Sequence, residues 1–297
     1  MSKPQISTLL EDIERKVLDP KVVPEIPPEV ISNFGVQVAK KVVGSLQRLR
    51  GKEGRKPKTI YASEVGKPCH RQTWYSLFLP ETAEPLLGKN ILKFLYGDIL
   101  EELLLLLARL AGHEVTDEQK RVEIPLTTGW KITGKMDAKI DGVVVDVKST
   151  SPYGFNEMNN NPKFEDKFGY RKQLSTYALA EQVEEDEPIS DPALFMVDKQ
   201  NGTLGLTYVR HEDVITSAET LTRALDRFDA VPPRHYADEV FTNGNRKLGT
   251  ACSYCAFKKQ CWPGLRAFAY AKGPVFMTEV VTEPKGIPEI KLKDITT

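Results

Sequence analysis

Long apolar runs, a secretory signal and an excess of one charge sign are all missing from this chain of 297 residues. No apolar run reaches the roughly 18 residues that a membrane span needs, and charged residues flank the most apolar stretch, 103–107. The amino terminus mixes both charge signs and lacks an apolar segment followed by a small-residue cleavage site. We therefore expect a cytoplasmic protein that has no membrane partner.

The charges balance, because 41 Lys and Arg residues face 41 Asp and Glu residues. No global field attracts a polyanion, so any contact with nucleic acid must use local patches. A phosphate-binding loop of the form GxxxxGK[ST] is also missing. An ATP-driven motor would therefore have to be a partner protein.

The order of periodic segments predicts an α/β fold with a sheet core. Residues 1–58 are expected to form an arm of two helices around a proline-rich stretch, 59–265 the core, and 266–297 a tail. The core is expected to contain helices at 86–110, 167–184 and 212–228, a helix capped by Ser63, and strands at 121–126, 130–140, 143–149, 193–198 and 203–210.

A β-hairpin is predicted around Asp141-Gly142, which is a strong two-residue turn signal. In that register residues whose numbers sum to 283 face each other, so Asp137 lies opposite Asp146. Alternation then divides the hairpin into two faces. The expected core face holds Met136, Ala138, Ile140, Val143, Val145 and Val147, and the expected polar face holds Lys135, Asp137, Lys139, Asp146 and Lys148.

Two carboxylates directly across a strand pair lie roughly 5 Å apart and repel each other unless a cation lies between them. Hard carboxylate oxygens suit Mg²⁺ or Mn²⁺, and Lys148 on the same face could orient a water or stabilise charge on a phosphate. The alternative is an ordinary exposed face, where the lysines neutralise two aspartates at little net energy.

Two helices could add to this site. Glu101 follows Gly97 by four residues on the helix expected at 86–110. A glycine in the middle of a helix costs about 1 kcal/mol, which calls for a packing or functional reason. Glu101 could be a third carboxylate. Gln173 and Tyr177 share one face of the second, suited to the site or to a nucleic-acid backbone, although such a pair is also common on surfaces.

Three of the four cysteines follow the pattern C-x₂-C-x₅-C at Cys252, Cys255 and Cys261, and the fourth, Cys69, lies far upstream. In a reducing compartment such cysteines favour metal binding over disulfides. Four thiolates hold zinc or an iron-sulfur cluster equally well, and His70 is an alternative zinc ligand. Lys258 and Lys259 could contact DNA or be solvated.

This set of motifs resembles the PD-(D/E)XK nuclease superfamily, and within it the RecB-like branch, over roughly residues 60–265. The matching positions are Gly97 with Glu101, Gly134 with Asp137 in GKMD, Asp146-Val147-Lys148, and Gln173 with Tyr177. The resemblance implies a restriction-endonuclease-like core, a mixed central sheet flanked by helices. It also implies that Mg²⁺ or Mn²⁺ is held by Glu101, Asp137, Asp146 and the main-chain carbonyl of Val147.

In that family the lysine assists the attacking water, which here is the role of Lys148. RecB-like and CRISPR-associated members usually have histidine where Glu101 stands, whereas phage recombination exonucleases often have glutamate. The glutamate should still bind metal.

The cysteine arrangement is similar to that of AddB-like nuclease domains and the CRISPR-associated Cas four family, and so are the segments SEVGKPCHRQTWY and CSYCAFKKQCWPG. Those proteins carry a 4Fe-4S cluster. The resemblance therefore implies such a cluster on Cys69, Cys252, Cys255 and Cys261, in a region formed by both ends of the core.

We thus expect a metal-dependent DNA exonuclease that acts at single-stranded ends, in recombination, repair, phage DNA processing or CRISPR adaptation. A helicase, recombination or CRISPR protein is a candidate partner, and self-association is a further hypothesis. Two rival readings are a non-catalytic factor that binds DNA ends or assembles complexes while keeping the nuclease fold, and a zinc-stabilised nucleic-acid-binding module.

Overall fold

The computed structural model describes residues 4–47, 56–85, 88–185, 190–227, 229–234 and 239–292. The chain divides into two compact units. The first unit comprises residues 1–66 and 88–219, and the second comprises 67–87 and 220–297. In the described part of the chain, no helix is long and apolar enough to cross a membrane.

A five-stranded mixed sheet forms the centre of the first unit. Its strand order is β2 (Val115–Thr116), β5 (Ala138–Ile140), β6 (Val143–Thr150), β7 (Ala193–Asp198) and β8 (Leu204–Tyr208). Strands β6 and β7 are parallel, and the other neighbours are antiparallel. Every residue of β7 is buried, as a strand covered on both faces requires.

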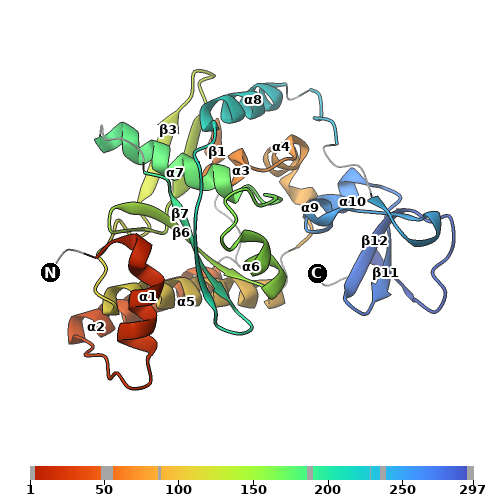
Figure 1. Ribbon diagram of the computed structural model, residues 1–297. Coiled ribbons are helices and arrows are strands. Elements are labelled where there is room, and N and C mark those ends of the chain that lie inside the picture. Colours follow the sequence, from red (N-terminus) through yellow and green to blue (C-terminus); the bar gives the residue numbers. More distant parts are fainter. Residues whose placement is uncertain are drawn as a thin grey trace. The chain divides into compact units, whose positions relative to one another are not determined.

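Two helices cover this sheet. Helix α5 (Gly88–Leu110) and helix α7 (Tyr170–Glu185) lie on opposite sides of β6 and β7 (Figure 1). Leu104 and Leu105 of α5 share one core cluster with Val145 and Phe195 of the sheet. The burial of these apolar side chains fixes the line along which α5 crosses the strands.

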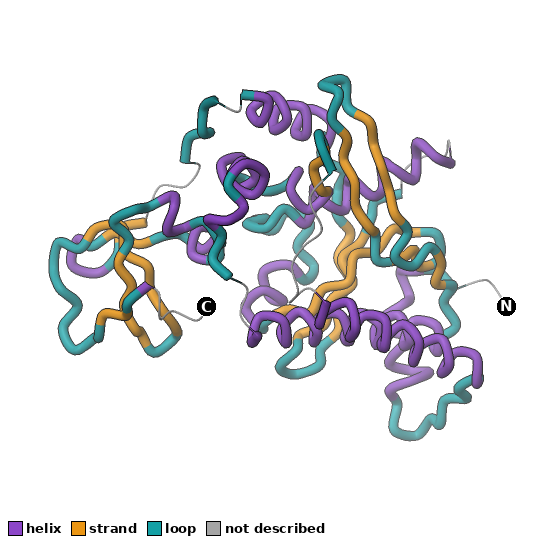
Figure 2. The backbone as a smooth tube through the Cα atoms, turned by 180° about the vertical axis from the view of Figure 1, so that it is seen from behind, coloured by secondary structure: helices purple, strands orange, loops and turns teal. Residues whose placement is uncertain are grey.

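The remaining elements of the first unit surround this layer. A second sheet contains β1 (Thr59–Tyr61), β4 (Lys131–Lys135) and β3 (Arg121–Pro125), in that order, and its long β3-β4 ribbon stands out in Figure 2. The other helical segments are η1 (Ile6–Thr8), α1 (Leu9–Ile13), η2 (Glu14–Leu18), α2 (Pro28–Gln47), α3 (Ala62–Val65) and α6 (Pro152–Met158).

The second unit is built on a five-stranded antiparallel sheet. Its order is β13 (Glu289–Ile290), β11 (Arg266–Tyr270), β12 (Gly273–Glu279), β10 (Arg246–Lys247) and β9 (Glu239–Val240). Its core contains Leu248, Leu265, Ala267 and Phe276. The helical segments here are α4 (His70–Phe78), η4 (Pro80–Thr82), η5 (Thr242–Gly244), α9 (Thr250–Ser253) and α10 (Lys258–Cys261), while α8 (Val214–Asp226) belongs partly to each unit.

Most expected elements are present, with boundaries shifted by a few residues, but two expectations are wrong. The strand expected at 130–140 is broken at Met136 and Asp137, because the backbone there bonds to Lys120 and Gln119 instead of a neighbouring strand. Lys135 therefore belongs to β4, in the other sheet. Tyr61, not Ser63, caps α3. The backbone N–H of Tyr61 donates to the Glu64 carboxylate at 2.9 Å.

A close backbone crossing fixes the start of α7. A Cβ atom on Gly66 would lie 2.4 Å from the carbonyl oxygen of Gly169, and one on Gly169 would lie 2.5 Å from the carbonyl carbon of Gly66. Gly169 also has a φ of +85°. Only glycine fits either position, so this crossing sets where α7 begins relative to α3.

Gly66→Ala is expected to destabilise the protein by about 1–3 kcal/mol, because the added methyl group meets rigid backbone. Gly35→Ala is the matched control, since nothing lies within 4 Å of a Cβ atom there in α2, and it should stabilise by up to ~1 kcal/mol. Denaturant unfolding of both variants measures the difference. An unfolding midpoint for Gly66→Ala equal to that of the wild type would contradict the close crossing.

Candidate active site and cysteine site

The hairpin register is confirmed. Asp141 and Gly142 form the turn with φ values of +50° and +81°, as a type I′ turn requires. Ile140 pairs with Val143 and Ala138 with Val145. Asp137 lies one residue before β5, and its Oδ2 accepts the N–H of Val147 at 2.8 Å.

Asp146 and Lys148 form the charged centre of the site. Asp146 is 1% exposed, and its Oδ2 lies 2.5 Å from Nζ of Lys148. The same Nζ lies 5.3 Å above the ring of Tyr170. Burial alone would lower the pKa of Lys148, but the charges of Asp146 and Asp137 outweigh burial and raise it well above its usual value. Lys148 therefore stays protonated at neutral pH.

Asp137 carries the clearest sign of crowded negative charge. Burial raises its pKa well above the usual value, and the charges of Asp146 and Glu101 raise it further. Lys148 and the N–H of Val147 oppose this effect without cancelling it. Three carboxylates, Glu101, Asp137 and Asp146, thus share two lysines, Lys41 and Lys148, and a further cation would relieve the repulsion at Asp137.

Glu101 comes to the site from α5 with partners of its own. Its Oε1 lies 2.6 Å from Nζ of Lys41 and accepts a hydrogen bond from Nε2 of Gln119 at 2.9 Å. Lys41 also lies 2.9 Å from Oε1 of the buried Glu102. Burial raises the pKa of Glu101 and Lys41 opposes that rise, while the charges of Glu102 and Asp146 add to it.

Gln173 and Tyr177 project from α7 toward the aspartates. Nε2 of Gln173 lies 3.1 Å from the Tyr177 hydroxyl and 3.4 Å from Oδ1 of Asp146. Burial, followed by the charge of Asp146, raises the pKa of Tyr177 beyond its usual value. A Cβ on Gly134 would lie 2.7 Å from the Tyr177 ring, so that glycine makes room for the tyrosine.

The start of α7 is held by one carboxylate. Oδ1 of Asp166 accepts the N–H groups of Gly169 and Tyr170 at 2.7 and 2.9 Å, and Oδ2 accepts that of Arg171 at 2.8 Å. Such capping satisfies the free donors of the first helical turn. It therefore orients the face of α7 that carries Tyr170, Gln173 and Tyr177.

The structure thus brings the expected active-site residues into one neighbourhood: Glu101, Asp137, Asp146, Lys148, Gln173 and Tyr177. The rival reading of an ordinary exposed face is wrong. Asp146 is buried, and Lys139, which is also buried, forms its ion pair with Glu181 of α7. Mid-helix Gly97 has no tight contact, since a Cβ there would meet only Ser149 Oγ at 3.7 Å.

Three residues of the site were missed by the sequence reasoning. Tyr170 lies three residues before Gln173, so helical spacing could have found it. Lys41 and Gln119 lie on α2 and on the loop before β3, and no local pattern links them to the aspartates. Their placement depends on how the helix and the loop pack.

The four cysteines meet in the second unit. All are free thiols, and all line one small cavity of about 20 Å³. Burial and the neighbouring thiols raise the pKa of Cys252 to about 12, and burial is also the main cause that raises the pKa of Cys255 to about 11. The far-upstream Cys69 is among the neighbours acting on both.

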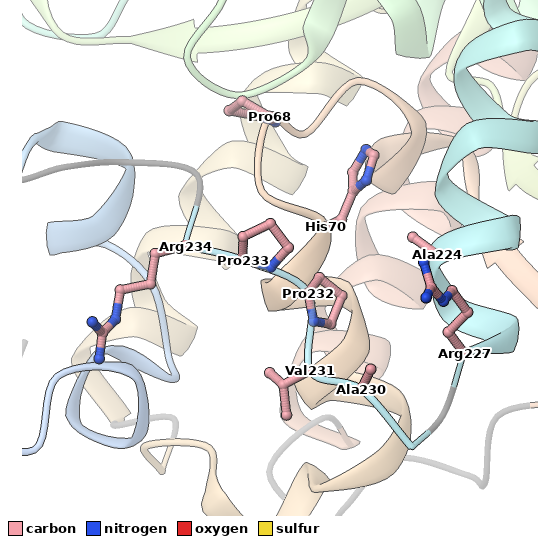
Figure 3. A pocket seen from close by; sticks show the side chains of 9 residues that line it. All are labelled: Pro68, His70, Ala224, Arg227, Ala230, Val231, Pro232, Pro233 and Arg234. Carbon is pink, nitrogen blue, oxygen red and sulfur yellow. The ribbon is translucent and has the colours of Figure 1, made fainter.

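Arg234 supports the cysteine segment from a neighbouring loop. Its Nε and Nη2 donate to the carbonyl oxygen of Cys261 at 2.9 and 2.7 Å, and its guanidinium lies 4.4 Å from the centre of the Trp262 ring. The loop lines a cavity of about 570 Å³ with Pro68 and His70 on either side of Cys69. Figure 3 shows the Arg234 side chain extending away from His70.

Lys258 and Lys259, expected either to contact DNA or to be solvated, both form ion pairs within the second unit. Lys258 is 3% exposed and forms an ion pair with Glu84. Lys259 is half-buried, lies 3.4 Å from the other oxygen of Glu84, and donates to the carbonyl of Leu292 at 2.7 Å. Both lysines therefore hold the second unit together.

In the described ranges, no group of three or more His, Cys, Asp or Glu side chains is arranged so that it could hold a metal ion as it stands. At the acidic site this agrees with the ion pairs, because lysines lie against two of the carboxylates.

Comparison with protein families identifies the class of protein as a nuclease. The family described as the PD-(D/E)XK nuclease superfamily matches residues 42–262. Because the match covers well over half of the chain, the protein belongs to this superfamily. Its mixed sheet flanked by helices agrees with that assignment.

The solved structures that resemble the chain are distant. The SSO0001 protein is 17% identical, with a TM-score of 0.44, over 75% of this chain and 92% of that one. A candidate exonuclease from Eubacterium rectale is 18% identical, with a TM-score of 0.31, over 70% and 86%. Comparison with curated proteins gave no match.

Asp137→Asn is expected to raise the midpoint of thermal unfolding of the metal-free protein by a few degrees at neutral pH. The folded state raises the pKa of Asp137, so the ionised carboxylate destabilises the fold, and the gain should shrink as the pH falls through that pKa. Asp213→Asn is the control. Hydrogen bonds to Thr216 lower the pKa of Asp213, so its loss should lower the midpoint slightly. A lower midpoint for Asp137→Asn would contradict the charge crowding.

Proposed function

We propose that the protein is a metal-dependent DNA exonuclease that hydrolyses phosphodiester bonds at single-stranded ends. The observation that carries the proposal is the pair of the half-buried Asp137 and the buried Asp146, with the charge of Glu101 acting on Asp137 and with Lys148 against Asp146. Membership of the nuclease superfamily supports the chemistry. The preference for single-stranded ends rests on the resemblance of the motifs to the RecB-like branch.

The donor set fits a hard divalent cation. The charge of Asp146 raises the pKa values of Glu101 and Asp137, and the charge of Glu101 also raises that of Asp137. Carboxylate oxygens are the ligands that Mg²⁺ and Mn²⁺ prefer. We assign the metal to Glu101, Asp137, Asp146 and the main-chain carbonyl of Val147, whose N–H already bonds to Asp137. When bound, the ion neutralises charge on the phosphodiester and makes a water more acidic.

Lys148 has a defined role in this proposal. Because its pKa is raised, its ammonium group acts as a donor and a positive charge rather than as a base. It can orient the attacking water and stabilise the negative charge that develops on the phosphate. Gln173 and Tyr177 are donors beside it, and Tyr177 keeps its proton because its pKa is also raised.

We also propose that Cys69, Cys252, Cys255 and Cys261 hold a 4Fe-4S cluster. The four thiols line one cavity and raise the pKa of Cys252 together, and binding as thiolates would remove that cost. Cys69 belongs to the segment 67–87 and the others to 220–297. The cluster would therefore join the two chain segments of the second unit and stabilise it.

Residues 59–265 would together form the nuclease core. The sequence has no P-loop, so any ATP-driven motor would be a partner protein, and a helicase or a recombination or CRISPR protein is a candidate. Self-association is a separate proposal, which light scattering tests by the mass in solution.

The nuclease proposal is tested with end-labelled single-stranded DNA, Mn²⁺ or Mg²⁺, and protein purified without oxygen. Asp146→Ala is expected to abolish cleavage, and Lys148→Met to slow it by about 10²–10³. Asp213→Ala, an exposed carboxylate of the same unit, should cut like the wild type. Timed products that shorten from one end establish an exonuclease and its polarity. A wild type that binds DNA ends without cutting any strand form would favour the assembly-factor reading instead.

The cluster proposal predicts four iron atoms with acid-labile sulfide per chain and a broad visible absorbance. Cys255→Ser should lose that absorbance and unfold at a lower temperature, because a ligand is lost and the second unit loosens. Ser253→Ala changes the same segment without removing a thiol and should keep both properties. Zinc without iron or sulfide would favour the zinc-stabilised module, and an unchanged unfolding temperature in Cys255→Ser would rule out a structural cluster.

A further inference from the structure

The N-terminal arm places a lysine in the acidic site. Helix α2 lies along α5 and carries Lys41, whose Nζ lies 2.6 Å from Glu101 and 2.9 Å from Glu102. One helical turn later, Oγ of Ser45 donates to Oδ2 of Asp98 at 2.5 Å. Asp98 precedes Glu101 by three residues on α5, so the two contacts share one face of each helix.

Two polar contacts tie α2 to α5. Ser45 is the only fully buried residue of α2, whereas α5 buries leucines in the main core. The side chains of Lys41 and Glu101 are only 14% and 12% exposed, and that of Glu102 is 3% exposed. Their ion pairs are thus mostly withdrawn from solvent, where they are stronger than surface pairs.

Lys41 has two carboxylate partners, but only one of them belongs to the acidic site. Glu101 acts electrostatically on Asp137 and Asp146. Glu102 follows Glu101 on α5, so its side chain leaves the helix about 100° away from that of Glu101, and it is buried against Lys41. The ammonium group can therefore leave Glu101 and keep a charged partner, so it never becomes a buried charge without a counter-ion.

We propose that Lys41 is a positioning residue of the nuclease site, which holds Glu101 in the metal-free protein and passes to Glu102 when a divalent ion binds. This proposal rests on the proposed function. The lysine sets the metal affinity, because an ion that binds Glu101 must displace a positive charge already in contact with it. It also gives the arm, residues 1–58, a direct part in the site.

The same contact has a second effect in the metal-free protein. Glu101 and Glu102 are adjacent in sequence and both are largely buried, so without Lys41 they would repel each other with little solvent to screen them. Lys41 thus stabilises the metal-free state while it competes with the metal. Its loss should therefore change stability and metal affinity in opposite directions.

The test measures Mn²⁺ binding to the full-length, metal-free protein by calorimetry or by the electron paramagnetic resonance of free Mn²⁺. Lys41→Met should tighten binding about tenfold, which equals ~1.4 kcal/mol, and should lower the unfolding temperature of the metal-free protein. Lys41→Arg should restore an affinity close to that of the wild type. Glu102→Gln removes the alternative partner and should weaken binding.

Two controls separate this exchange from a loosened arm. Ser45→Ala removes the hydrogen bond from α2 to Asp98 and should leave Mn²⁺ affinity unchanged. The effect of Glu102→Gln should largely vanish in the double variant with Lys41→Met, because it acts through the lysine. If Lys41→Met fails to fold, the other variants still test the proposal. Lys41→Arg and Ser45→Ala should then bind Mn²⁺ about as tightly as the wild type, and Glu102→Gln should bind it more weakly.

Unchanged or weaker Mn²⁺ binding by Lys41→Met would overturn the proposal, and so would equal shifts in Lys41→Met and Ser45→Ala. Binding that Asp146→Ala does not reduce would place the ion elsewhere and overturn it too. Cleavage is measured separately. If the affinities follow the expected order but no nucleic acid is cut, the role of Lys41 stands and the exonuclease proposal fails.

Discussion

The structure of the first unit depends on the repulsion between carboxylates that the hairpin forces together. A tight turn at Asp141-Gly142 sets the register of β5 and β6. Asp137, one residue before β5, then lies close enough to the buried Asp146 for the two charges to repel. Burial removes the solvent that would screen them. The surrounding elements compensate: β6 supplies Lys148 and the N–H of Val147. A fold that keeps such a pair retains a place for a cation.

Three helices bring further groups to these carboxylates. Helix α5 brings a third carboxylate, Glu101, and α2 brings Lys41 against it. Helix α7 begins at a crossing that only glycine allows, with Asp166 capping its first turn, and this fixes Gln173 beside Asp146. The active site is thus assembled from elements far apart in the chain, each placed by its own packing.

In the second unit the crowded groups are the thiols of four cysteines. Four thiols from two distant segments share a cavity, and their crowding and burial oppose ionisation of Cys252. Arg234 holds the carbonyl of Cys261 from outside, while Lys258 and Lys259 anchor the same segment to Glu84. In both units, groups that disfavour one another in the bare protein are kept together by apolar packing and by ion pairs around them.

The sequence by itself determined what depends on local geometry. Turn chemistry and the alternation of a strand predicted the register of β5 and β6, and the cysteine pattern predicted that the four thiols share one site. It misjudged Lys135, because the break at Met136 depends on hydrogen bonds to a loop fifteen residues or more upstream. Only the tertiary structure decided that Lys258 is buried, that Lys139 pairs with Glu181, and that Lys41 reaches Glu101. Local periodicity records which face of an element is apolar, whereas the partner of a long charged side chain depends on which other element packs beside it.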